Sequence, residues 1–168
     1  MAATANAPTA APLNDRELRA WRGMLRAHAA LTKALDAQLE AAHGLPLTSY
    51  EVLMYLADAD DQRMRMCDLA TSVIISRSGL TRLVDRLERE GLIERVSCST
   101  DARGAFAKLT AAGREQVAAA RPTHLAGVRA MYLDHFTPEE QEVLARAWER
   151  ILPGVVEHAA ACDPGAGS

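Results

Sequence analysis

One stretch of the chain, residues 64–110, restricts the fold more than any other part of the sequence. It contains, in order, a short alternating segment, a short apolar-faced segment, a tight connection, an amphipathic segment and two β-prone segments around a polar turn. We expect a strand at 64–66, helices at 67–73 and 76–90, and a β-hairpin over 92–109. Gly91 supplies the left-handed residue that ends the second helix. The order predicts a helix-turn-helix followed by a hairpin wing.

The helix expected at 76–90 has two chemically different faces. At about 100° per residue, its leucines and Val84 fall in one apolar arc. The opposite face mixes arginine with small hydroxyl side chains, which suits the major groove of DNA, where Arg reads guanine or phosphate. A solvated face with i,i+4 pairs such as Asp85–Arg89 is the alternative. This outer face consists of Ser78, Thr81, Arg82, Asp85 and Arg89, with Arg77 and Arg86 at its flanks.

The turn between the two expected strands carries one arginine. Arg103 lies in the polar stretch 99–104, with Asp101 two residues before it. A narrow minor groove has a strongly negative potential that attracts an inserted Arg. We expect Asp101 to hold the guanidinium extended and to cap the turn.

Long helices flank this segment on both sides. The first opens with a capping box at Asn14 and Glu17, and the last opens at Thr137 with Pro138 in its first turn. We also expect a capping box at Thr48 to open a short helix, and Ser76 and Thr110 to begin the helices before and after the hairpin. Pro122 should kink or restart the helix that Thr110 opens. The apolar stripe of the first helix is too wide for a short neighbour to cover. It consists of Leu18, Trp21, Leu25, His28, Leu35 and Leu39.

Composition favours a mainly helical soluble protein. The chain has 168 residues, of which 49% are hydrophobic, 24% charged and only 4% aromatic, so aliphatic side chains must fill the core. Its formal charge is −3, so any DNA contact must come from local charge, almost all of it arginine. Apolar runs are too short to span a bilayer, and the first residues do not resemble a signal peptide. We therefore expect a cytoplasmic protein.

Catalytic and metal-binding patterns are missing from the sequence. The five histidines have no metal-ligand spacing, and no glycine-rich phosphate loop occurs. The three cysteines form no CxxC motif, and their odd number does not make a disulfide framework. We expect Cys67 and Cys98 to be small buried hydrophobic residues. The sequence predicts no enzyme, no cofactor and no metal site.

The same residues resemble the MarR family of bacterial transcriptional regulators. The resemblance covers residues 14–158, because long helices on both sides of the winged motif are also the family's layout. The sequence of the recognition helix and the wing signature together support this resemblance. The matching segments are Leu69 and Ala70, 76–88, 91–95, the wing signature 101–103, and Leu109 and Thr110 with Gly113.

The resemblance implies a homodimer whose first and last helices interlock and whose winged lobes bind adjacent major grooves of a pseudo-palindrome. It implies that Arg103 enters the minor groove and that Asp101 orients it. Asp85 is expected to orient an arginine, since phosphates repel a carboxylate. The resemblance also implies which residues of the recognition helix face DNA. They are Ser76, Arg77, Ser78, Thr81, Arg82 and Arg86.

The predicted fold class is mainly α (α+β), a winged helix-turn-helix with long N- and C-terminal dimerisation helices. We divide the chain into a disordered tail at 1–13, a dimerisation helix at 14–47 and a winged DNA-binding lobe at 48–110. C-terminal dimerisation helices follow at 111–160, and a frayed tail at 161–168.

Members of the resembled family often bind aromatic or phenolic anions between the dimer helices and the winged lobe. The residues expected to line such a site here are Trp21, His28, Tyr50 and Met54, and the expected regulator is a repressor released by the anion. Two alternatives stay open. One is a redox-responsive regulator using Cys67 or Cys98, although the first helix lacks the cysteine that such members use. The other is a winged-helix protein-interaction module, which a DNA mobility shift would distinguish.

Overall fold

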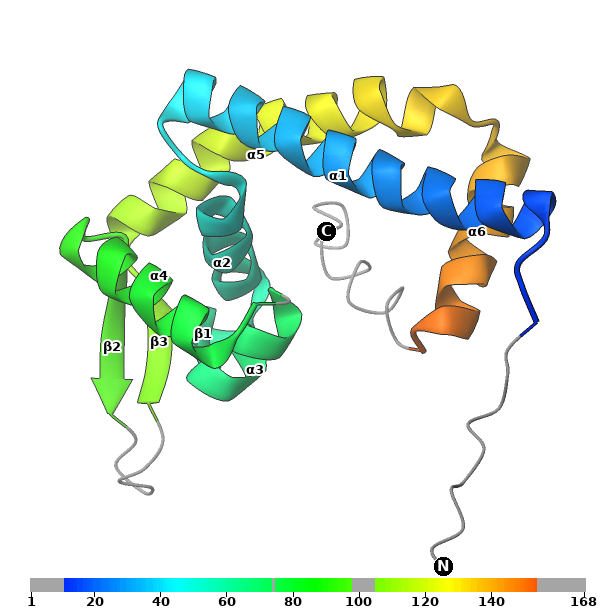
Figure 1. The fold of residues 1–168 in the computed structure, drawn as a ribbon. Coiled ribbons are helices and arrows are strands. Elements are labelled where there is room, and N and C mark those ends of the chain that lie inside the picture. The colour runs from blue at the N-terminus through cyan, green and yellow to red at the C-terminus, as the bar shows by residue number, and fades with distance from the viewer. Residues whose placement is uncertain (1–10, 74, 98–104, 154–168) are drawn as a thin grey trace, which may run out of the picture.

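The computed structural model describes residues 11–73, 75–97 and 105–153. Helices dominate, and a three-stranded antiparallel sheet is the only sheet within these ranges, so the predicted mainly helical winged fold is confirmed (Figure 1). The helices are α1 Asp15–His43, α2 Leu47–Asp58, α3 Met66–Ser72, α4 Arg77–Arg89, α5 Ala111–Met131 and α6 Pro138–Ile151. The strands are β1 Arg63–Arg65, β2 Ile93–Ser97 and β3 Ala105–Leu109, and 3-10 turns occur at η1 Asp60–Gln62 and η2 Leu133–His135.

The sheet has the strand order β1-β3-β2, so the hairpin strand β3 lies in the centre. Ile93 pairs with Leu109 at one end of the hairpin and Ser97 with Ala105 at the other. The three-residue strand β1 joins the free edge of β3. Helices α2, α3 and α4 stand beside this sheet and form a lobe with it, which Figure 1 shows on the left.

One hydrophobic core holds the lobe together, and its buried members all lie between Leu39 and Ala120. Tyr50, Leu69, Val84 and Leu109 are among the fully buried side chains, each from a different element. The core therefore joins α2, α3, α4 and the sheet to the adjoining ends of α1 and α5.

Helix starts follow the predicted caps at four places. Asn14 and Thr137 each form a complete capping box, while the hydroxyls of Ser76 and Thr110 accept backbone N–H groups three residues on. Each side chain satisfies a backbone donor that the first helical turn leaves unpaired. These four helices begin where the sequence predicts.

The expected capping box at Thr48 is wrong. Helix α2 begins at Leu47, after Pro46, and no side chain of its own caps it. Instead, the Asp36 carboxylate of α1 accepts the Leu47 N–H at 2.8 Å. A carboxylate eleven residues away in sequence thus replaces the local cap and joins α2 to α1.

The expected restart at Pro122 is also wrong, because α5 runs unbroken from Ala111 to Met131, whereas the expected kink stays a prediction. Proline removes one backbone N–H and releases the carbonyl four residues earlier. Pro122 and Ala118 both lie on the exposed side of α5, so water can satisfy that carbonyl. The helix tolerates the residue without a break.

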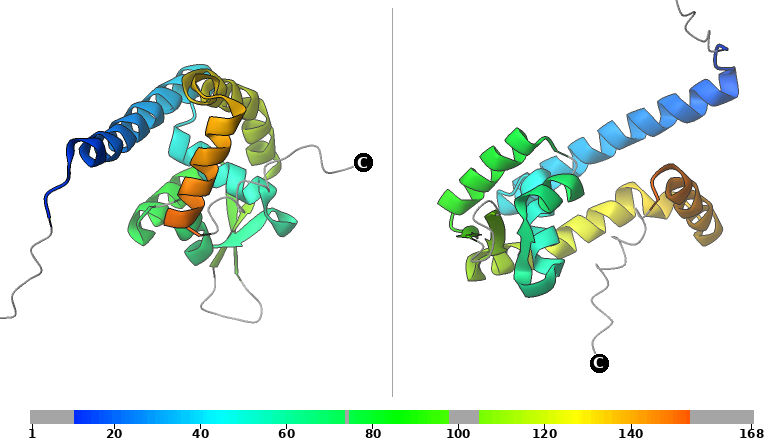
Figure 2. Two further views of the ribbon diagram at one scale, coloured as in Figure 1. Left: turned by 90° about the vertical axis from the view of Figure 1, so that its right-hand side faces the viewer. Right: turned by 90° about the horizontal axis from the view of Figure 1, so that it is seen from below.

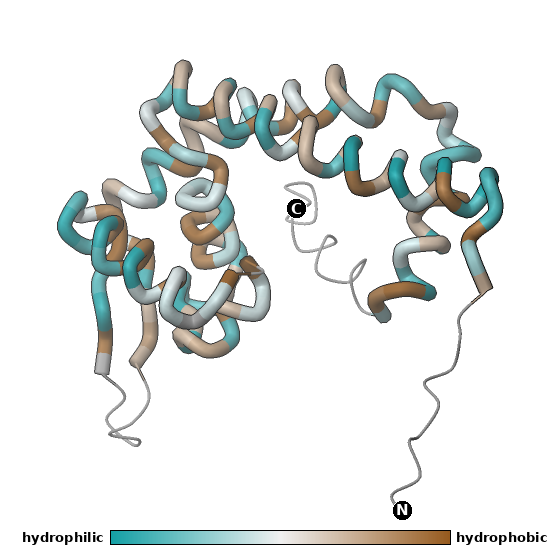
Figure 3. Tube along the Cα trace, viewed as in Figure 1, coloured by the Kyte–Doolittle hydropathy of each residue, from teal (hydrophilic) through white to brown (hydrophobic). Residues whose placement is uncertain are grey.

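The C-terminal half of α1 packs against α5, and its N-terminal half extends away from the lobe (Figure 2). His43 Nε2 and Thr123 Oγ1 lie 2.8 Å apart at this junction, and Gln116 donates to the His43 carbonyl. Helix α6 turns away from the end of α5 and has no buried residue. Apolar residues recur along these outlying helices, as Figure 3 shows, and several of them are not covered by any other described part of the protomer.

Candidate nucleic-acid interface

Helix α4 presents one apolar and one polar face, as its sequence predicts. Leu80, Val84 and Leu87 are buried against the lobe, and Leu83 is half-buried. On the opposite face Ser76, Ser78, Thr81 and Arg82 are all exposed. The buried row fixes the rotation of the helix about its axis, so the polar face must point to solvent.

The first turn of α4 is held by its own hydroxyl groups. The Ser76 Oγ accepts the Gly79 N–H at 3.1 Å and lies 3.3 Å from the Ser78 Oγ. Arg77 is the first residue of the helix. This geometry places Ser76 and Ser78 together at the N-terminal end, which in helix-turn-helix proteins is the end that meets base edges.

Arg86 is placed differently from the other residues predicted to face DNA. Its guanidinium donates to Ser49 Oγ of α2, and its Nε lies 3.8 Å from Glu90. Ser49 is the one buried polar residue of the core described. Arg86 therefore ties the recognition helix to α2, and its predicted contact with DNA stays a prediction.

Arg95 on β2 connects the wing to α4. Its guanidinium forms ion pairs with Asp85 and, at 3.2 Å, with Glu88, and its backbone N–H donates to the same Glu88. The expectation that Asp85 orients an arginine agrees with this contact. The alternative Asp85–Arg89 side-chain pair does not form, since Arg89 donates to the Asp85 carbonyl. Sequence analysis missed Arg95, although two carboxylates three residues apart on α4 were a usable signal.

The hairpin strands end where the predicted minor-groove residues begin. Asp101 and Arg103 lie outside the described residues, so their predicted roles stay predictions. The Ser97–Ala105 pair is the last of the described ladder, and the pairs Arg95–Ala107 and Ile93–Leu109 precede it. The ladder holds the two strands in a fixed register as far as Ser97 and Ala105.

Cys67 is exposed, so its expected burial is wrong. The inner side of the short helix α3 is formed by Leu69 and Ala70, and position 67 falls on the other side. The thiol lies 3.3 Å from an Asp68 carboxylate oxygen. Cys98 lies outside the described residues.

The four residues expected to line an effector site occupy two different environments. Trp21 and His28 lie on the projecting part of α1, and the Trp21 side chain is 53% exposed. Tyr50 is only 1% exposed, and Met54 packs against the core near it. The structure does not test their predicted common role.

Tyr50 contacts a histidine that sequence analysis did not single out. Its ring centroid lies 4.6 Å from that of His124 on α5. The Nδ1 atom of His124 is buried and has no hydrogen-bond partner among the described residues, and burial lowers the pKa of this imidazole. An aromatic position on α2 and one on α5 thus meet beside the junction with α1.

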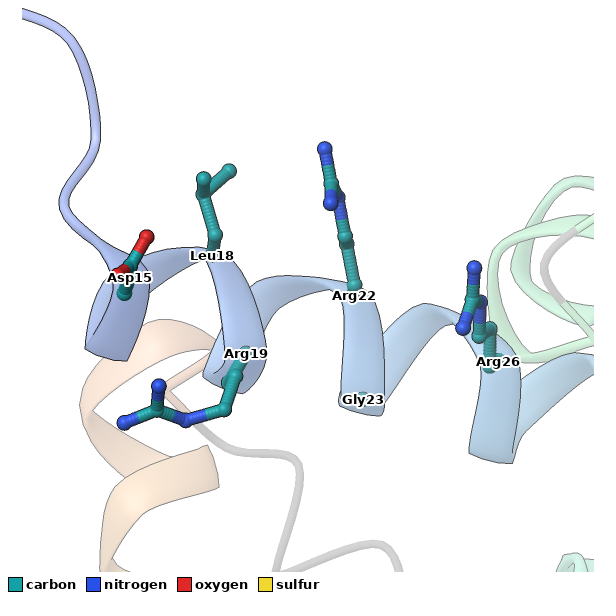
Figure 4. A pocket seen from close by; sticks show the side chains of 6 residues that line it. All are labelled: Asp15, Leu18, Arg19, Arg22, Gly23 and Arg26. Carbon is teal, nitrogen blue, oxygen red and sulfur yellow. The ribbon is translucent and has the colours of Figure 1, made fainter.

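The projecting half of α1 carries a basic hollow of about 410 Å³. Figure 4 shows Leu18, Arg22 and Arg26 pointing to the same side of the helix. The described residues that line the hollow are Asp15, Leu18, Arg19, Arg22, Gly23 and Arg26. Among the described residues no cluster of His, Cys, Asp or Glu could hold a metal ion, and no helix is long and apolar enough to cross a membrane.

Comparisons with known proteins agree with this geometry. A family model described as MarR family matches residues 43–104. The structure of Sco3205, a MarR family transcriptional regulator from Streptomyces coelicolor in complex with DNA, is 36% identical with a TM-score of 0.81. That match covers 86% of this chain and 94% of Sco3205.

Two further relatives extend the comparison. AbsC, a MarR family transcriptional regulator from Streptomyces coelicolor, is 36% identical over 90% of this chain and 99% of its own, with a TM-score of 0.78. The repressor YetL of Bacillus subtilis is 27% identical over 106 residues, and the chain spans only 63% of its length. The matched proteins are transcriptional regulators and not enzymes. Because the part aligned with Sco3205 is 36% identical and covers most of both proteins, this chain belongs to the MarR family of transcriptional regulators.

Proposed function

We propose that the protein represses transcription by binding a pseudo-palindromic operator as a homodimer and leaves it when a small aromatic anion binds. The observation that carries DNA binding is the exposed polar face of α4, which combines Ser76, Ser78, Thr81 and Arg82 opposite a buried apolar row. The relative Sco3205 was solved in complex with DNA, and YetL is named a repressor. Both support the proposal.

In this proposal α4 lies in the major groove and Arg82 reads a base edge. A good bidentate contact of this kind is worth about 1–3 kcal/mol of discrimination against the wrong base. The predicted minor-groove role of Arg103, oriented by Asp101, adds preference for AT-rich flanks. Two lobes related by a two-fold axis would meet half-sites about 10 base pairs apart.

Arg82→Ala tests this interface. It should weaken binding to an operator recovered by in vitro selection by about 1–3 kcal/mol and relax the base preference at one position of each half-site. Fluorescence anisotropy with the selected duplex and single-base variants measures both effects. Arg16→Ala, an exposed arginine on the side of α1 opposite Trp21 and Leu25, is the matched control. Parent-like affinity and base preference in Arg82→Ala would remove Arg82 from the recognition face.

The homodimer is supported by the large apolar side chains that remain exposed in one protomer. None of them belongs to the winged lobe, and all lie on α1, α5 or α6 or directly beside the outer end of one of these helices. They are Leu13, Trp21, Leu25, Leu125, Val143, Ile151 and Leu152. A partner covering them through α1, α5 and α6 would bury more than the roughly 1,600 Å² of a standard interface.

The effector proposal rests on the position of α2. Its first turns contact three other elements: Leu47 bonds to Asp36 of α1, Ser49 to Arg86 of α4, and Tyr50 stacks on His124 of α5. An occupant that displaced Tyr50 would therefore disturb the support of the recognition helix. A ligand acts only through its different affinity for the two states, and a coupling of about 1–3 kcal/mol is enough.

A panel of aromatic carboxylic acids and phenols should release the protein from its operator and quench the fluorescence of Trp21. Tyr50→Phe and His28→Ala should each raise the concentration needed for release by about tenfold or less, because each removes one polar contact. Release unchanged in both variants would place the effector elsewhere. Absence of release by every compound would leave a constitutive regulator.

A further inference from the structure

Two arginines lie over one aromatic ring on the outer face of the wing sheet. Arg63 and Arg65 come from the edge strand β1, and Phe106 comes from the central strand β3. The guanidinium carbons lie 5.6 Å and 5.4 Å from the ring centroid, within cation–π range. The alternation of a strand puts all three side chains on the face opposite Met64 and Ala107, of which Ala107 is fully buried.

The charges on this face are compensated everywhere except at Arg65. Arg63 forms an ion pair with Asp61, and Lys108 forms one with Glu94, both at 3.1 Å. Arg65 makes no ion pair with any residue in the described ranges, and its side chain is exposed. The ring of Phe106 restrains the Arg65 guanidinium while leaving its N–H groups open to a further partner.

The register places Arg65 near the wing end of the sheet. Arg65 pairs with Phe106, one residue along β3 from Ala105, whereas Arg63 pairs with Lys108 two residues farther back. At about 3.4 Å per residue, Arg65 is some 7 Å nearer than Arg63 to the last described pair of the hairpin, Ser97–Ala105. Figure 1 shows that this end of the sheet and helix α3 lie at the same end of the lobe.

We infer that Arg65 is a further DNA contact, a phosphate-binding residue beside the wing. The inference rests on the proposed DNA-binding function. A minor groove is only about 6 Å wide and is walled by two phosphate backbones, so a wing that enters it has phosphates on both sides. The planar guanidinium of Arg65 can bind a phosphate through two N–H groups, with Phe106 holding it in place.

This contact differs in kind from those of the recognition helix. A phosphate contact fixes register and affinity without reading sequence. Each neutralised phosphate contributes about 0.9 to the slope of log affinity against log salt concentration on duplex DNA. Loss of Arg65 should therefore weaken binding equally on specific and unrelated sequences and flatten the salt dependence.

The test measures binding of the full-length protein to two duplexes by fluorescence anisotropy across a salt series. One duplex is selected in vitro with the parent, and the other is a scrambled sequence of the same composition. Arg65→Gln should lower the salt slope of the proposed dimer by about 1.8 on both duplexes, about 0.9 for each lobe, and leave the ratio of the two affinities unchanged. Arg65→Lys should restore most of the slope, because it restores the charge. Arg129→Gln, an exposed arginine near the far end of α5, should keep the parent slope.

The outcomes separate this inference from the proposed function. A parent that binds neither duplex at low salt would overturn both. A parent that binds with a steep salt slope while Arg65→Gln keeps that slope would overturn only the role of Arg65. An equal fall of the salt slope in Arg129→Gln would also overturn the role of Arg65, because the loss of any positive charge would then explain the lower slope. A change in the affinity ratio would make Arg65 a base-reading residue instead.

Discussion

At the scale of single residues, two partly buried titratable groups give the protein opposite pH responses. Burial lowers the pKa of His124 and raises the pKa of Glu51. A lowered imidazole pKa means that the unfolded chain binds the proton more readily, so stability falls as the pH drops below about 6.5. A raised carboxyl pKa favours the protonated folded state, so stability falls as the pH rises through the folded pKa of Glu51.

We therefore expect His124→Phe to flatten the stability curve on the acid side of neutrality while keeping the ring contact with Tyr50. Glu51→Gln should raise the free energy of unfolding at pH 7, where the parent holds a partly buried carboxylate. Denaturant titrations from pH 4 to pH 8 measure both changes. His135→Phe, at an exposed position in η2, is the control. A His124→Phe curve with the parent's slope between pH 5 and pH 7 would contradict the assignment.

At the scale of elements, three helical glycines differ in what a methyl group would meet. A Cβ at Gly113 would lie 2.1 Å from the Leu92 carbonyl oxygen, which is backbone and cannot turn aside. One at Gly127 would lie equally close to Gln38 Oε1, the end of a flexible side chain. One at Gly23 would meet nothing within 4 Å. The start of α5 thus approaches the wing at Gly113 in a way that only glycine allows.

Alanine substitutions at these glycines should rank accordingly. Gly113→Ala should cost about 1–3 kcal/mol of unfolding free energy or more, as overpacking does. Gly127→Ala should cost less, and Gly23→Ala should stabilise by roughly 0.5–1 kcal/mol through helix propensity. Thermal and denaturant unfolding of the three variants measure the order. A Gly113→Ala protein as stable as the parent would show that the wing can move away from α5.

The elements also show what could be predicted from sequence. Asn14, Ser76, Thr110 and Thr137 predicted four helix starts, because each cap bonds within its own first turn. Helix α2 could not be placed in this way, since its cap comes from Asp36 on another helix.

In the candidate DNA-binding site, too, the features set by local sequence were predictable and those set by tertiary contacts were not. The exposed face of α4 follows from helical periodicity, so its orientation was predictable. The inward contact of Arg86 with Ser49 and the bracing of Arg95 by α4 depend on tertiary packing. Arg65 was missed because its significance comes from its cross-strand partner Phe106, which no local pattern gives.

At the scale of the whole molecule, the exposed apolar residues of α6 make the proposed dimer testable. Val143 on α6 is 57% exposed, and Ile151 is 65% exposed. We expect Val143→Asp to shift the proposed dimer to a monomer, because a charge would replace an apolar side chain in the proposed interface. Sedimentation at micromolar concentration measures the shift. Thr71→Asp, on the exposed side of α3, should stay dimeric.

Stability should depend on concentration as well. If folding and association are linked, the Tm of the parent should rise with protein concentration and that of Val143→Asp should not. A parent that sediments as a monomer at micromolar concentration would contradict the proposed dimer.

Helix α1 can act as a lever. Its 29 residues extend about 43 Å at 1.5 Å per residue, and the joint with the lobe is short: Gly44 in a left-handed conformation, Leu45 and Pro46. The Asp36–Leu47 bond stiffens this joint from the side. A tilt of roughly 5° about the N-terminal end would sweep the lobe through about 4 Å over that length. In the proposed dimer, a small tilt far from the recognition helix would therefore change the distance between the two lobes by roughly a tenth of a helical turn of DNA.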